Sequence, residues 1–156
     1  MGGSKAKFRK QKQESTTKTE SIETSRNQEI SWNDIKHFTP REFTCKCDGL
    51  CDHPVVISLE LVAKLDSIRD SMGRSIGITS GTRCERHNQR VGGKRRSAHT
   101  PKNGVSHAVD VHCPDSAFRY AFLKSALPLF NRIGIAKSFI HVDDDPELPG
   151  NVIWVY

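Results

Sequence analysis

Apolar residues recur at helical spacing between positions 58 and 72 of the chain. A serine that can cap a helix stands before them, and a glycine that can end one follows at position 73. This pattern predicts an amphipathic helix with one buried face. A Pro-Asp-Ser sequence at 114–116 predicts the start of a second helix, which continues to about position 127. The side chains expected in the core are Leu59, Leu61, Val62, Leu65 and Ile68 of the first helix and Phe118, Ala121, Phe122 and Leu127 of the second.

Short runs of β-branched and aromatic residues predict strands, mostly in the second half of the chain. The runs cover 75–79, 108–111, 131–136, 138–142 and 152–156. Helices that lie between mainly antiparallel strands indicate an α+β domain, in which helices flank a small antiparallel sheet.

Two of these strands carry polar residues on one face. Because side chains alternate along a strand, Asp110 points away from the face of His107, whereas His141 and Asp143 share a face. His99, in the loop before the first of these strands, can turn towards Asp110. Two His and one Asp are a ligand set for a catalytic zinc ion, which keeps one position open for water. We therefore predict a zinc ion bound by His99, Asp110 and His141.

Five short motifs occur in a fixed order along the chain. They are Ser-Gly-x-Arg-Cys-x-x-His-Asn from position 80, Val-Gly-Gly from 91, Ser-x-His from 97, Ala-x-Asp from 108 and Phe-Ile-His-Val-Asp from 139. The ordered set resembles the zinc D-Ala-D-Ala carboxypeptidase family over about residues 35 to 143. That family includes the L-alanyl-D-glutamate endopeptidases of bacteriophage lysis and shares its fold with hedgehog signalling domains, so the resemblance implies a hedgehog-like fold.

The resemblance implies a zinc metallopeptidase that hydrolyses an amide bond next to a D-amino acid in murein stem peptides, as a carboxypeptidase or an endopeptidase. A phage endolysin is the expected context, with a virion-borne lysin as the alternative. In the family, a shorter loop usually separates the first His from the Asp. His107 therefore remains an alternative ligand to His99.

Hydrolysis also requires a proton acceptor and a group that stabilises negative charge. Arg83 is expected to bind a substrate carboxylate or the developing oxyanion through its planar guanidinium. The family often places an acid shortly before the last His, but Ser138 stands there in this chain. Asp143 is therefore our candidate proton acceptor. The alternative is that it orients a ligand His, in which case His112 and Asp144 are the next candidates.

Substrate contacts are expected from Arg83, from Ser97 and from Trp154. Trp154 shares a face of the last expected strand with Tyr156, and the pair either packs in the core or lines a substrate groove. The stretch from 83 to 102 is strongly basic, with a single acid, Glu85. Its charge is either a solvated face or a surface that attracts anionic wall or outer-membrane polymers, or equally nucleic acid.

The chain has 156 residues and a formal net charge of +6. Residues 1–30 are polar and basic and are expected to form a disordered tail, followed by a single zinc peptidase domain over 31–156. No apolar run reaches the roughly 18 residues of a membrane span, and no apolar leader segment is visible. We therefore expect a monomer that stays in the cytoplasm until it is released to act on the peptidoglycan of the bacterial wall.

Four potential metal ligands crowd into nine residues: Cys45, Cys47, Cys51 and His53. They suggest a second, structural zinc ion, although the spacing differs from the usual pairs of Cys-x2-Cys, and reduced loop thiols are the alternative. Disulfides are not expected with an odd number of cysteines and no export signal. The remaining cysteines, Cys84 and Cys113, are expected to be small buried hydrophobic residues.

Two other functions are compatible with the sequence. The first is a hedgehog-like module that binds zinc without turnover, because the acid is missing at its usual position. The second is a basic protein that binds nucleic acid through the tail and the Cys/His cluster.

Overall fold

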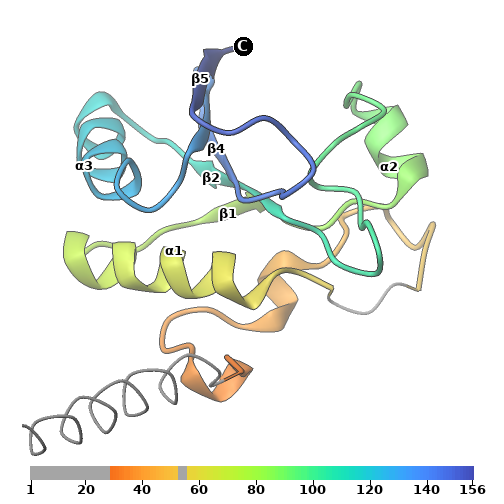
Figure 1. Ribbon diagram of the computed structural model, residues 1–156, viewed down its shortest axis with the longest axis horizontal. Coiled ribbons are helices and arrows are strands. Elements are labelled where there is room, and N and C mark those ends of the chain that lie inside the picture. Colours follow the sequence, from red (N-terminus) through yellow and green to blue (C-terminus); the bar gives the residue numbers. More distant parts are fainter. Residues whose placement is uncertain (1–28, 53–55) are drawn as a thin grey trace, which may run out of the picture.

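The computed structural model describes residues 29–52 and 56–156, and the expected tail lies almost wholly outside them. Two 3-10 helices open the described chain, η2 (Trp32–Asp34) and η3 (Pro40–Phe43). The α-helices and strands then follow (Figure 1), and they are α1 (Leu59–Met72), β1 (Ile78–Ser80), α2 (Glu85–Arg90), β2 (Ala108–His112), α3 (Ser116–Ala126), β3 (Arg132–Ile135), β4 (Phe139–Asp143) and β5 (Val152–Val155).

The five strands form one sheet in the order β1-β2-β4-β3-β5. β1, β2, β4 and β3 pair antiparallel to their neighbours, whereas β5 joins the edge parallel to β3. The prediction of an α+β domain with a small, mainly antiparallel sheet is confirmed.

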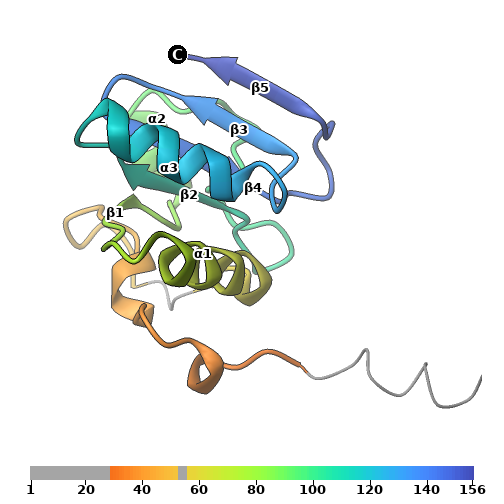
Figure 2. The same ribbon diagram turned by 90° about the vertical axis from the view of Figure 1, so that its left-hand side faces the viewer.

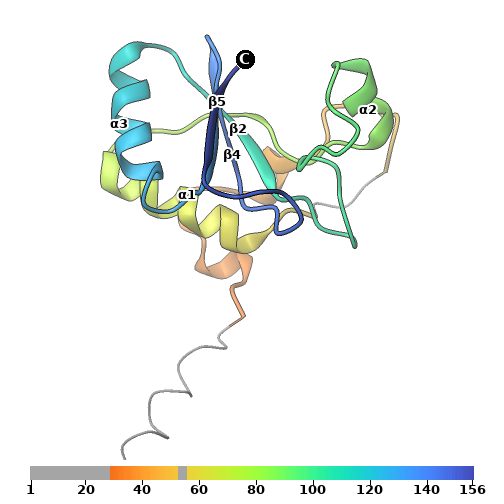
Figure 3. The ribbon, with the colours of Figure 1, turned by 45° about the horizontal axis from the view of Figure 1, so that its top comes forward.

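The two longer helices cover one face of the sheet. Figure 2 shows α1 and α3 side by side in front of the strands, and Figure 3 shows α2 on the opposite side of the sheet. A cluster of apolar side chains fills the core between the helices and the sheet, and its sheet side is made by Val109 and Val111 of β2 and by Ile140 and Val142 of β4. Because side chains alternate along a strand, the polar residues of β2 and β4 must lie on the face away from α1 and α3.

The ends of α1 and α3 follow from local capping. The hydroxyl of Ser58 accepts the Leu61 amide proton at 3.3 Å, and Gly73 ends α1 in the left-handed region at φ 58°. Asp115 caps α3 by accepting the Phe118 amide proton at 2.7 Å. The predicted core role of Leu127 is wrong: the side chain is 52% exposed, because α3 ends at Ala126 and the next core position is taken by Phe130.

The short helix α2 was not anticipated. It spans six polar residues, and only Asn88 among them is buried, so the segment lacks the apolar stripe that identifies a helix in a sequence. Among the described helices, none is long and apolar enough to cross a membrane.

Candidate metal centre

One row of residues crosses the sheet on the face away from α1 and α3. Ser80 of β1 lies opposite Asp110 of β2, Asp110 opposite His141 of β4, and His141 opposite Gly134 of β3. Trp154 of β5 completes the row opposite Gly134. The strand register therefore places Asp110 and His141 side by side, although 31 positions separate them in the chain.

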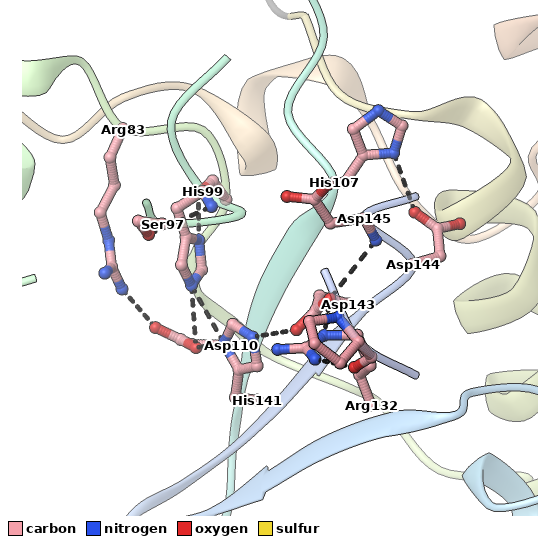
Figure 4. A network of polar contacts seen from close by, with 12 residues as sticks. Arg83, Ser97, His99, His107, Asp110, Arg132, His141, Asp143, Asp144 and Asp145 are labelled. Atoms are coloured by element: carbon pink, nitrogen blue, oxygen red, sulfur yellow. Dashed lines mark hydrogen bonds and ion pairs between the residues drawn. The ribbon is translucent and has the colours of Figure 1, made fainter. Parts of the chain in front are cut away.

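His99 approaches this pair from the loop after α2 (Figure 4). Its Nε2 atom lies 3.1 Å from Oδ1 of Asp110 and 3.2 Å from Nδ1 of His141, and that Nδ1 lies 2.8 Å from the same Oδ1. All three side chains are buried, with at most 6% of their surface exposed. The structure thus brings the three predicted ligands together as a compact group that can hold a metal ion.

In each imidazole, the outer nitrogen, which is the one that points away from Asp110, has a hydrogen-bond partner that fixes the tautomer. Nδ1 of His99 lies 2.7 Å from the carbonyl oxygen of Gly81, and Nε2 of His141 lies 2.9 Å from Oδ2 of Asp143. A carbonyl and a carboxylate can only accept, so both outer nitrogens must carry the proton when the rings are neutral. The inner nitrogens then point lone pairs at the carboxylate of Asp110. Three converging lone pairs repel one another unless a cation lies between them, and zinc fits two imidazoles and one carboxylate.

The pKa values of the three residues are set by burial and by the hydrogen bonds among them. Burial lowers the pKa of His99, which keeps that ring neutral. Burial acts in the same direction on His141, but hydrogen bonds with Asp110 and Asp143 outweigh it and raise the pKa of this imidazole. Burial alone would raise the pKa of Asp110, yet its hydrogen bonds with both imidazoles hold that pKa well below its ordinary value.

The loop between His99 and Asp110 is longer than is usual in the family, and its additional residues form a tight turn. Lys102 and Val105 exchange two backbone hydrogen bonds of 2.8 and 3.0 Å, and Asn103 and Gly104 between them have positive φ, as in a type I′ turn. His99 therefore keeps its place beside the sheet. The alternative ligand His107 does not join the group, because its Nδ1 lies 3.1 Å from Oδ1 of Asp144.

Arg83 lies directly against the centre. Its Nη2 donates to Oδ2 of Asp110, and its Nε donates to the hydroxyl of Ser80 at 2.8 Å. Nη2 thus holds the carboxylate that faces the imidazoles, while Nε fixes the guanidinium against β1, a role that sequence reasoning did not assign to this residue. Ser97 lies one step further out, where its hydroxyl accepts the amide proton of His99 at 3.3 Å.

Asp143 lies on the far side of the His141 ring. Oδ2 accepts the His141 proton, while Oδ1 lies 2.7 Å from Nε of Arg132 and 3.3 Å from the amide of Asp145. The side chain is 1% exposed, and the pKa of its carboxyl is lowered because the hydrogen bond from His141 and the charge of Arg132 outweigh burial. These contacts are those of a residue that orients His141.

The other candidates for proton transfer lie further away. Asp144 forms an ion pair with Lys64 and contacts Nδ1 of His107, at 3.1 Å each, outside the row of ligands. His112 shares the site face of β2 with Asp110, two positions further along the strand, and is exposed.

An aromatic wall adjoins the centre on the β5 side. The Trp154 ring lies 5.4 Å from the His141 ring, and Tyr156 lies 6.1 Å from Trp154. The wall depends on Gly134, because a Cβ atom there would come within 2.8 Å of both aromatic side chains. Arg132 stacks on the outside of Trp154 at 5.4 Å. Neither Gly134 nor Arg132 was anticipated, since their roles follow only from the strand register.

The cysteines differ from expectation in one respect. Cys113 lies in the apolar core as predicted, and Cys84 is buried. The prediction that Cys84 is only a small hydrophobic residue is incomplete, because its sulfur joins those of Cys45, Cys47 and Cys51 in a second group that could hold a metal ion. His53, the expected fourth ligand, lies outside the described residues.

Comparison with known proteins agrees with the geometry of the site. A family model described as Peptidase M15 matches residues 36–143, which include all three residues of the buried His-Asp-His group and all four clustered cysteines. No curated protein matches the chain. The match confirms the resemblance found in the sequence motifs. Because it covers more than half of the chain, the protein belongs to the peptidase M15 family of D-Ala-D-Ala carboxypeptidase-like zinc peptidases.

Proposed function

We propose that this protein is a zinc-dependent peptidoglycan peptidase that hydrolyses an amide bond next to a D-amino acid in murein stem peptides. The observation that carries the proposal is the convergence of His99 Nε2, Asp110 Oδ1 and His141 Nδ1 within 3.2 Å of one another, with both outer imidazole nitrogens already satisfied. Three ligands of this kind leave a position open, as hydrolytic zinc sites require.

Each ligand is held by a partner of its own. Gly81 fixes the ring of His99, Asp143 fixes that of His141, and Arg83 holds the second oxygen of Asp110. A zinc ion bound there would supply a Lewis acid for the scissile carbonyl and lower the pKa of water. The protein contributes a pre-organised pocket in which the ligand atoms need not reorient when the ion binds.

Arg83 and the aromatic wall are the proposed substrate contacts. Arg83 uses Nη2 and Nε within the protein, so its remaining nitrogen, Nη1, is the one proposed to bind a substrate carboxylate or the developing oxyanion. Trp154 offers a half-buried ring next to His141, suited to the apolar part of a stem peptide. Ser97 is proposed as a further substrate contact, because its hydroxyl lies next to His99 and accepts the amide proton of that residue.

The orientation of Asp143 bears on which residue accepts the proton during hydrolysis. Asp143 faces Nε2 of His141, whereas the three ligand atoms converge on the Nδ1 side of that ring. We therefore favour an orienting role for Asp143 over the general-base role that its position in the sequence suggests. His112, on the same face of β2 as Asp110, is then the next candidate for proton transfer.

The setting that we propose is bacteriophage lysis, with the enzyme acting as an endolysin or a virion-borne lysin. Beside the centre, α2 and the loop after it expose a series of cations, which would attract anionic wall or outer-membrane polymers. These residues are Arg86, Arg90, Lys94, Arg95 and Arg96.

A second candidate function is a zinc-binding module without turnover. The observation that favours it is that the two carboxylates contacting the ligand imidazoles, Asp110 and Asp143, are both fully engaged, and Ser138 stands where the family often has an acid. Zymography on purified murein separates the two functions. Clearing by the zinc-loaded wild type but not by His141→Ala supports the peptidase, whereas the absence of clearing by a wild type of verified zinc content supports the module.

A further inference from the structure

Four cysteine sulfurs gather on the α2 side of the molecule, apart from the His-Asp-His centre. The segment after η3 contributes Cys45, Cys47 and Cys51, and the fourth cysteine, Cys84, directly precedes α2. Their sulfur atoms all lie within 4.8 Å of one another. Cys47 and Cys84 are buried, and the other two are partly buried, so the cluster is enclosed by protein on most sides.

The backbone is shaped to bring these sulfurs together. Asp48 and Gly49 have φ values of 54° and 78°, and the Leu50 amide donates to the carbonyl of Cys47 at 3.2 Å, which defines a type I′ turn. The turn places the sulfurs of Cys47 and Cys51 3.1 Å apart. A type I′ turn requires positive φ at both central residues, a conformation that Gly49 adopts without strain.

Backbone amides also point at the sulfurs. The amide of Cys84 donates to the sulfur of Cys45 at 3.2 Å, and the amide of His87 donates to the sulfur of Cys84 at 3.4 Å. Amide donors of this kind stabilise negative charge on sulfur, as the surroundings of metal-bound thiolates do. Two of the four sulfurs thus receive a backbone amide proton.

A pair of disulfides explains the geometry less well. A disulfide requires sulfurs about 2.05 Å apart, and the cysteines, all of which lie in the described part of the chain, form no such bond. Four thiolates around one zinc ion, each at about 2.3 Å, would stand about 3.8 Å apart at the corners of a tetrahedron. The sulfurs, with 3.1 Å between Cys47 and Cys51 and no pair more than 4.8 Å apart, are gathered on the scale of such a tetrahedron.

We propose that Cys45, Cys47, Cys51 and Cys84 form a closed structural zinc site, separate from the ligands of the proposed peptidase centre. Four sulfur ligands leave no open position, so this ion takes no part in hydrolysis. Thiolates also select zinc over magnesium, calcium and manganese.

The site would lock the segment that positions the peptidase centre. Thr82 donates its amide proton to the Phe43 carbonyl at 3.0 Å, and a Cβ atom on Gly81 would meet the Phe43 backbone at 2.7 Å. Cys84 extends this contact and directly follows Arg83. A zinc ion shared by Cys84 and the Cys45–Cys51 segment would thus hold in place both Arg83 and the Gly81 carbonyl that orients His99.

The test is the zinc content of the full-length protein, measured by elemental analysis together with native mass spectrometry. The wild type should bind two zinc ions per chain. Cys84→Ser and Cys47→Ser should each bind one, His141→Ala should bind one, and Cys84→Ser combined with His141→Ala should bind none. Cys113→Ser is the matched control, because this buried cysteine lies in the apolar core, and it should keep both ions.

Cobalt substitution distinguishes the two sites without any measurement of activity. Sulfur-to-cobalt charge-transfer absorption should appear in the wild type and in His141→Ala and be lost in Cys84→Ser. If the cysteine variants do not fold, the wild type still decides, because a thiol-specific mercurial should release one of its two zinc ions. His53→Ala should retain both ions.

Several results would overturn the proposal. They are one zinc ion in the wild type together with none in His141→Ala, two ions retained in Cys84→Ser, loss of the second ion in His53→Ala, and an intact mass that reveals disulfides in the freshly purified protein. None of these outcomes depends on whether the protein cleaves murein, so this site and the proposed function fail independently.

Discussion

Replacing Asp143 by Asn distinguishes an orienting residue from a proton acceptor. In the wild type, one carboxylate oxygen receives the proton of His141 Nε2 at 2.9 Å and the other receives that of Arg132 Nε at 2.7 Å. Asparagine offers only one acceptor oxygen, and its amide nitrogen can only donate. Because the Asp145 amide also points at the Arg132 side, the amide oxygen belongs there, and the NH2 group must face His141.

The expected magnitude follows from the tautomer. A donor that faces Nε2 of His141 forces that nitrogen to accept, which moves the ring proton to Nδ1, the atom proposed to bind zinc. Loss of an outer partner of a ligand His typically weakens metal binding about 10- to 100-fold. That range corresponds to about 1.4–2.7 kcal/mol of binding free energy.

The assay is a zinc titration of Asp143→Asn against a chromogenic chelator, followed by turnover on soluble muropeptides at saturating zinc. Asp144→Asn is the matched control, since its carboxylate contacts Lys64 and His107 instead of a ligand of the centre, and its zinc affinity should stay at the wild-type value. The orienting role predicts weaker zinc binding with turnover recovered at saturation. Unchanged zinc affinity combined with lost turnover would refute it and assign proton transfer to Asp143.

Three further predictions address other parts of the site. Arg83→Lys should lower kcat about 100-fold, because a single ammonium group cannot hold Asp110 and the oxyanion together, and a near-normal kcat would exclude this role. Gly134→Ala should lower the free energy of unfolding by about 1–3 kcal/mol, since its Cβ atom displaces Trp154, whereas Gly77→Ala, with only an ordinary contact at 3.6 Å, should be neutral in urea denaturation. Zinc affinity should fall about tenfold for each unit by which the pH is lowered, because protons compete with zinc for His141. The fall should begin above pH 6.5, the ordinary imidazole pKa, because the pKa of His141 is raised. An affinity that does not change with pH would contradict this.

Much of the centre could be anticipated because strand periodicity fixes which side chains share a face. The alternation in β2 and β4 separated Asp110 from His107 and paired His141 with Asp143 before any coordinates were known. The caps of α1 were equally readable, since Ser58 and Gly73 act through local backbone geometry.

Other features depend on contacts between distant segments, which a single sequence does not encode locally. Cys84 joins the cysteine cluster only because the β1–α2 connection lies on the segment after η3. Arg132 reaches Asp143 across the β3–β4 register, and Trp154 reaches His141 across Gly134. Leu127 was misplaced for a local reason, because the helical pattern did not reveal that α3 ends one residue earlier.

The measurement that tests the central claim most directly is mass spectrometry of soluble muropeptides incubated with the zinc-loaded protein. We predict paired products whose masses sum to that of the substrate plus one water, with the new terminus at a D-amino acid. His141→Ala, which lacks a ligand of the centre, should give no products. Muropeptides that remain intact with a wild-type protein of verified zinc content would contradict the account and leave a metal-binding module without peptidase activity.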